Sequence, residues 1–162
     1  MIDDVALFLT YAVKLEADAA ETYERLGAQM EERAKVTVAE LFRRFAGYCR
    51  QHLAAARERA EREAGGVLDL APQDYRWPDG RSPEAPAAID LDQLTVRAAL
   101  EMALETERNA CDFYSAVAGQ TRSQQVQELA QEFAEEEAEH VEALECWLER
   151  LDSPGGLTTY RP

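Results

Sequence analysis

The sequence repeats itself, and this internal duplication is the feature that most restricts its fold. Residues 5–23 match residues 96–114 after a shift of 91 positions, and residues 38–52 match residues 126–140 after a shift of 88. The first shift pairs Glu16 with Glu107, and the second pairs His52 with His140. An ordinary apolar repeat would not conserve a glutamate and a histidine at fixed spacing. We therefore interpret the chain as two copies of one supersecondary unit.

Each repeated segment has the periodicity of a helix with one apolar side. Apolar residues recur every three or four positions in four stretches, which is typical of amphipathic helices packed in a bundle. The predicted helices are residues 3–34, 37–64, 90–119 and 126–151. Two antiparallel helical hairpins account for this order.

Capping signals support the helix ends. Thr37 and Glu40 have the spacing of a capping box, which predicts that the second helix begins there. Gly65 is placed to end that helix, because glycine adopts the left-handed conformation of many helix ends. Asp90 or Asp92 is the expected cap of the third helix.

Residues 65–89 have a different composition from the helices. The segment contains four prolines, which forbid regular helix. Since so long a loop is uncommon in a compact domain, we interpret it as a crossover that runs the length of the bundle. Its rings, Tyr75 and Trp77, need a surface to cover, and this favours a homodimer or larger homo-oligomer. The predicted domain is residues 1–152, followed by a flexible tail at 153–162.

Charge and cysteine content exclude several classes of protein. The formal net charge of −15 argues against nucleic acid or an anionic membrane as a partner. No apolar run is long enough for a transmembrane helix. Cys49, Cys111 and Cys146 form no C-x-x-C pair, which argues against a disulfide framework, a zinc ribbon or a rubredoxin-type iron site. A cytoplasmic location is the expectation.

Five polar residues interrupt the apolar stripes. They are Glu16, His52, Glu107, Glu137 and His140. The midpoint of Glu16 and His52 falls at residue 34, and that of Glu107 and His140 falls between residues 123 and 124. Both midpoints coincide with expected turns, so the glutamate and histidine of each hairpin should lie at one height.

A metal site is one explanation of these buried polar residues. Carboxylate and imidazole together suit iron, manganese or zinc. The alternative is that the glutamates bond a tyrosine or histidine across the bundle and that His52 is a satisfied core histidine. Cys49 is either a ligand, a residue that lines the pocket or small core filler. Cys111 lies one turn after Glu107 and either lines the pocket or is small core filler.

At these residues the sequence resembles the rubrerythrin-like branch of the ferritin-like di-iron superfamily. The matching pieces are Leu15-Glu16 with Tyr23, Glu107 with Phe113-Tyr114, and Glu137-Ala-Glu-His140. The resemblance covers roughly residues 4–151. It implies an all-α, ferritin-like four-helix bundle that is often dimeric, built from two hairpins joined by a long crossover.

The resemblance also implies a chemistry. One or two iron ions would support a non-haem oxidoreductase acting on peroxide or dioxygen, peroxidase- or ferroxidase-like, with zinc or manganese as alternative metals. Glu16 and Glu107 would be terminal ligands, Glu137 a bridging ligand, and His52 and His140 the imidazole ligands. The hydroxyls of Tyr23 and Tyr114 would bond ligand carboxylates.

Three departures from the family pattern make the expected site atypical. Cys49 stands where the family has a bridging glutamate, and Ala110 offers no extra carboxylate one turn after Glu107. Without a C-x-x-C module, electrons would come from a separate donor. We therefore expect one tight metal position and one weak or empty position. The alternative function is a ferritin-like scaffold with a degenerate site that acts as a binding or assembly module.

Overall fold

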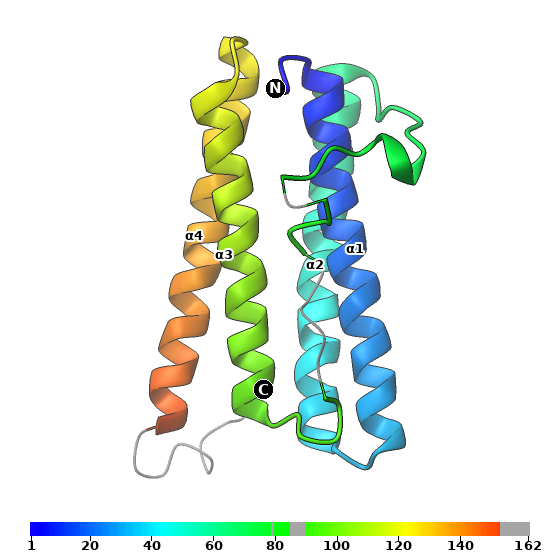
Figure 1. Cartoon of the computed structure of the whole chain (residues 1–162), viewed down its shortest axis with the longest axis vertical. Helices are drawn as coiled ribbons and strands as arrows, with labels where there is room; N and C mark the ends of the chain where they lie inside the picture. The colour runs from blue at the N-terminus through cyan, green and yellow to red at the C-terminus, as the bar shows by residue number, and fades with distance from the viewer. Residues whose placement is uncertain (79, 85–89, 153–162) are drawn as a thin grey trace.

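Four long helices form the molecule in the computed structural model, which describes residues 1–78, 80–84 and 90–152 (Figure 1). The helices are α1 (Val5–Glu32), α2 (Val36–Ala64), α3 (Val96–Gln120) and α4 (Gln124–Asp152). At 25 to 29 residues each, they are about 40 Å long. Within the described ranges there is no strand, and no helix is long and apolar enough to cross a membrane. The predicted tail, 153–162, lies outside them.

The helices pair as two hairpins. α1 packs along α2 and α3 along α4, with the partners of each pair running in opposite directions (Figure 1). Short turns at residues 33–35 and 121–123 join them. The fold class predicted from the duplication is therefore confirmed.

The boundaries of α2 are predicted correctly at one end only. Gly65 ends the helix in a left-handed conformation with φ of 73°, as expected. The capping box at Thr37 is wrong, because α2 already begins at Val36 and its N-terminus has no side-chain cap. Thr37 is an exposed residue of the first turn.

The third helix begins later than the sequence suggests. Its cap is Thr95, whose hydroxyl accepts a 3.2 Å hydrogen bond from the Ala98 amide, so neither Asp90 nor Asp92 caps it. The residues before Thr95 form a turn that hydrogen bonds from Lys35 stabilise. The Lys35 ammonium donates to the carbonyls of three residues of that turn: Leu91, Asp92 and Leu94.

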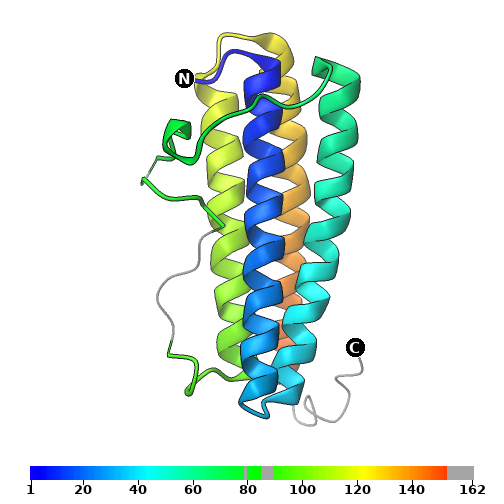
Figure 2. The same cartoon turned by 90° about the vertical axis from the view of Figure 1, so that its right-hand side faces the viewer.

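The crossover is fastened at both ends of the bundle. Near its start, the Leu68 amide donates to the Thr10 hydroxyl at 2.8 Å. At the other end of the bundle, the Lys35 contacts hold the turn that follows the crossover, residues 91–94, beside the α1–α2 turn. It therefore runs the length of the bundle over the face formed by α1 and α3 (Figures 1 and 2). A short 3₁₀ turn, η1 (Pro72–Asp74), lies within it.

The aromatic residues of the crossover find their surface on their own chain. The rings of Tyr75 and Trp77 lie 5.0 and 4.8 Å from that of Tyr11, and Trp77 also contacts Phe113 at 5.4 Å. These rings therefore give no argument for a partner. Self-association stays a prediction.

The apolar core is divided in two along the bundle axis. One cluster gathers the second half of α1, the first half of α2, the start of α3 and Leu144 of α4. The other gathers the start of α1, the end of α2, the second half of α3 and the first half of α4. Glu16, Glu107 and Glu137 belong to neither cluster and lie at the level where one gives way to the other. The two clusters hold the helices together on both sides of a polar layer.

The cap assignment predicts unequal effects for two threonines. Thr95→Ala should lower the free energy of unfolding by about 1 kcal/mol, because it removes a side-chain cap. Thr37→Ala makes the same deletion in an exposed first turn without a cap and should cost less than half as much. Urea unfolding of the metal-free protein measures both. Equal losses would contradict the assignment.

Candidate metal centre

All four helices contribute to one cavity at mid-height. It has a volume of about 310 Å³. The five polar residues that the sequence predicts all line the cavity: Glu16, His52, Glu107, Glu137 and His140. Cys49 and Glu84 also line it. Tyr48 of α2 and Trp147 of α4 also border the cavity, and His52 and His140 are partly exposed. The cavity therefore reaches solvent on the side of α2 and α4.

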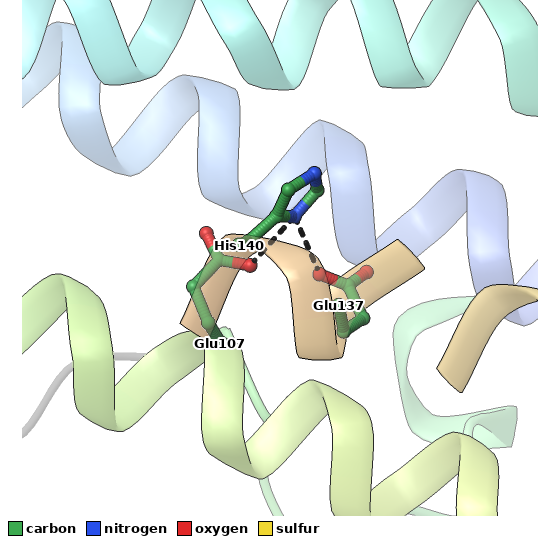
Figure 3. Close-up of side chains that lie close together, drawn as sticks. All are labelled: Glu107, Glu137 and His140. Carbon is green, nitrogen blue, oxygen red and sulfur yellow. Dashed lines mark hydrogen bonds and ion pairs between the residues drawn. The ribbon is translucent and has the colours of Figure 1, made fainter. Parts of the chain in front are cut away.

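The second hairpin presents a close three-residue group. The Nδ1 atom of His140 lies 3.2 Å from a carboxylate oxygen of Glu107 and 3.0 Å from one of Glu137. Figure 3 shows that this one ring nitrogen faces both carboxylates. One nitrogen and two oxygens, all within 4.8 Å of one another, converge as three ligands of a single ion would.

The first hairpin carries a looser version of the same arrangement. The Nδ1 atom of His52 lies 3.8 Å from a carboxylate oxygen of Glu16. The rings of His52 and His140 stack across α2 and α4, with centroids 4.6 Å apart and planes 3° from parallel. The glutamate and histidine of each hairpin thus lie at one height, as the midpoints predict, and the two halves meet at the paired imidazoles.

Burial sets the protonation of the carboxylates. It raises the pKa of the Glu16 carboxyl well above its ordinary value, and the charges of Glu137 and Glu107 add to the shift. Burial also raises the pKa of Glu137 to about 8, although its hydrogen bond with His140 opposes the change. For Glu107 the effect of burial is outweighed by hydrogen bonds with His140 and Glu137, so its pKa is lowered.

The pKa values of the two histidines shift in opposite directions. Burial alone would lower the pKa of His140, but its hydrogen bonds to Glu107 and Glu137 raise it to about 10. Burial lowers the pKa of His52, and the charge of His140 lowers it further. His52 is therefore a neutral imidazole, the form that binds metals.

The donor set fits a divalent cation. No lysine or arginine is among the residues that line the cavity, so within the described chain the His140 imidazole is the one positive group that faces its carboxylates. Buried carboxylates that lack a positive partner are costly. A cation held by Glu107, Glu137 and His140 would remove this cost, and a mixed carboxylate and imidazole set suits iron, manganese or zinc.

Cys49 is a poor substitute for a glutamate. Its side chain is 7% exposed. Burial raises the pKa of the thiol, and the charge of Glu16 raises it further, so the group is uncharged. In this state it lines the cavity without contributing negative charge. Cys111 is partly buried, and its thiol points to the backbone carbonyl of Ala134.

The hydroxyls of Tyr23 and Tyr114 make no hydrogen bond to a carboxylate among the described residues, and their role beside the ligands stays a prediction. The Tyr23 hydroxyl bonds the hydroxyl of Thr106 at 3.0 Å instead of a carboxylate. Thr106 precedes Glu107 and holds Tyr23 against α3. The Tyr114 hydroxyl is buried, and no hydrogen bond to it occurs in the part of the chain that the structure describes.

Glu84 is a residue of the site that the sequence does not reveal. It comes from the crossover, is 7% exposed and lines the same cavity as the helix glutamates. A helical stripe identifies Glu16 or Glu107, whereas a proline-rich loop has no period that shows where a side chain points. The only signal is a lone carboxylate next to Pro83, which is too common to single out.

Comparison with known proteins agrees with this geometry. The rubrerythrin family model matches residues 98–159, which hold the close three-residue group. A solved structure, that of an uncharacterized conserved protein from Magnetospirillum magnetotacticum, superposes with a TM-score of 0.68 at 30% identity. The match covers 93% of this chain and 97% of that one. No curated protein matches the sequence.

The chain belongs to the rubrerythrin family. Because the solved relative extends over nearly the whole chain, both hairpins belong to the family fold. The family model itself covers the second hairpin, which carries Glu107, Glu137 and His140. The first hairpin, which carries Cys49, lies outside the residues that the family model matches.

The protonation of the centre predicts how stability depends on pH. Between its ordinary pKa of 6.5 and about 10, His140 keeps a proton in the folded chain that it loses on unfolding. Glu137 likewise keeps a proton in the folded chain, and loses it on unfolding, between its ordinary pKa of 4.5 and about 8. A folded state that binds more protons loses stability as the pH rises. The free energy of unfolding of the metal-free protein should therefore fall from about pH 7 to about pH 9.

Chemical denaturation at a series of pH values tests this. Glu137→Gln removes one of the two groups, so the decline below about pH 8 should become shallower. The exposed Glu139→Gln is the matched control and should keep the slope of the wild type. Stability that rises with pH over this range would contradict the assignment.

Proposed function

We propose that this rubrerythrin-family protein binds iron at the mid-bundle centre and takes part in redox chemistry with peroxide or dioxygen. One observation carries the proposal: the convergence of Glu107, Glu137 and His140 in a cavity whose lining includes no lysine or arginine. These residues would hold the ion. Glu16 and His52 extend the donor set across the stacked imidazoles.

The surrounding residues fit this role. When bound, the iron would supply reversible one-electron chemistry. The chain itself orients His140 between two carboxylates and keeps apolar clusters above and below the centre. The opening between α2 and α4 gives a small oxidant or a separate electron donor a route to the cavity.

Metal binding is the first test. Ferrous iron, titrated anaerobically, should bind the wild type, and Glu137→Gln or His140→Gln should weaken the tightest ion by more than about 100-fold, since losing even an outer-shell partner costs ~10–100-fold. Glu139→Gln changes a neighbouring exposed carboxylate of α4 and should bind like the wild type. Parallel titrations with manganese and zinc rank the metals.

The redox part of the proposal is tested on the same protein loaded with ferrous iron. Mixing it with peroxide or with dioxygen and following oxidation of the bound ion by absorbance should give a faster reaction than free ferrous iron shows. A wild type that binds no iron contradicts the proposal. Tight binding without reaction toward either oxidant would favour the scaffold alternative.

A further inference from the structure

The crossover places a buried carboxylate at the centre from outside the four helices. Glu84 is 7% exposed and lines the cavity together with Glu16, Glu107 and Glu137. The crossover covers the face of α1 and α3 (Figure 2), whereas Cys49 belongs to α2. Glu84 therefore approaches the centre from a different side than the position that Cys49 occupies.

Nothing else in the described chain explains this burial. Within the described residues, the Glu84 carboxylate makes no hydrogen bond and no ion pair. It lines the same cavity as Glu107, Glu137 and Glu16 instead. Burial raises the pKa of the Glu84 carboxyl, and the charges of these three glutamates raise it further. A loop side chain can usually turn to solvent, and in its charged form a carboxylate buried among carboxylates is costly unless it has a positive partner.

The number of carboxylates in the cavity fits two divalent cations as that partner. Di-metal carboxylate bundles use four glutamates and two histidines. The helices here supply three glutamates, Glu16, Glu107 and Glu137, and two histidines that face each other across the cavity. Glu84 is the fourth carboxylate. Four carboxylates match the charge of two divalent cations, whereas three leave one positive charge in excess.

We infer that Glu84 is a metal ligand that replaces the carboxylate missing at Cys49, so that the centre holds two divalent cations. The inference rests on the proposed metal-binding function and changes the expectation of one weak or empty position. Glu84 restores the charge of the missing glutamate from another side of the cavity. The second ion then lies on the side of Glu16 and His52, where the helices alone supply too few carboxylates.

Metal counting on the full chain tests this. Anaerobic dialysis against manganese or ferrous iron, followed by elemental analysis, should give two ions per wild-type chain. Glu84→Gln keeps the shape and removes the charge, so it should retain one ion and weaken the second by at least about tenfold. Asp69→Asn is the control, because Asp69 is an exposed carboxylate of the same crossover, and it should still bind two ions.

Two further measurements separate a ligand from a structural residue. Without metal, Glu84→Gln should unfold at no lower temperature than the wild type, because the carboxyl that it replaces makes no hydrogen bond or ion pair within the described residues. With metal, its gain in unfolding temperature should be smaller. Glu84→Asp keeps the charge on a shorter arm and should bind the second ion more tightly than Glu84→Gln.

The outcomes distinguish this inference from the function on which it rests. A wild type that binds no ion refutes the proposed function. A wild type that binds a single ion, or a Glu84→Gln variant with wild-type count and affinities, overturns the inference and leaves the proposed function standing. A metal-free Glu84→Gln variant that unfolds well below the wild type would show a structural role and also overturn it.

Discussion

The structure depends on how four carboxylates are kept inside a helical bundle. Glu16, Glu84 and Glu137 are each less than 9% exposed, and Glu107 joins them in one cavity without a lysine or arginine in its lining. Mutual repulsion and lost hydration both oppose this arrangement. The two apolar clusters on either side hold the helices in place despite it. Binding of divalent cations would turn the same arrangement from a cost into a source of stability.

The two duplicated hairpins make different contacts at this centre. In the second hairpin, His140 forms hydrogen bonds with both Glu107 and Glu137. In the first, His52 and Glu16 are further apart, and Cys49 brings no charge. The crossover, which neither copy of the repeat contains, adds the carboxylate at Glu84. If Glu84 binds metal as we infer, the connection between the hairpins supplies the carboxylate that Cys49 does not.

Most of the fold and the helix-borne site follow from the sequence, because a helix converts spacing into direction. Glu16 and Glu107 recur within matching stripes, and the equal heights of glutamate and histidine follow from the turn positions. Tertiary contacts decide the rest. Lys35 holds the turn that moves the cap of α3 to Thr95, and Tyr75 packs on its own bundle. Glu84 could not be predicted, since an irregular loop carries no period.

The most direct test of this account is anomalous X-ray scattering at the iron edge from crystals loaded with ferrous iron under anaerobic conditions. The account predicts anomalous peaks inside the mid-bundle cavity, one next to Glu107, Glu137 and His140 and a second within reach of Glu16 and Glu84. Loaded crystals without iron in the cavity, or with iron only on the acidic surface, would contradict the claim that these buried carboxylates exist to bind metal.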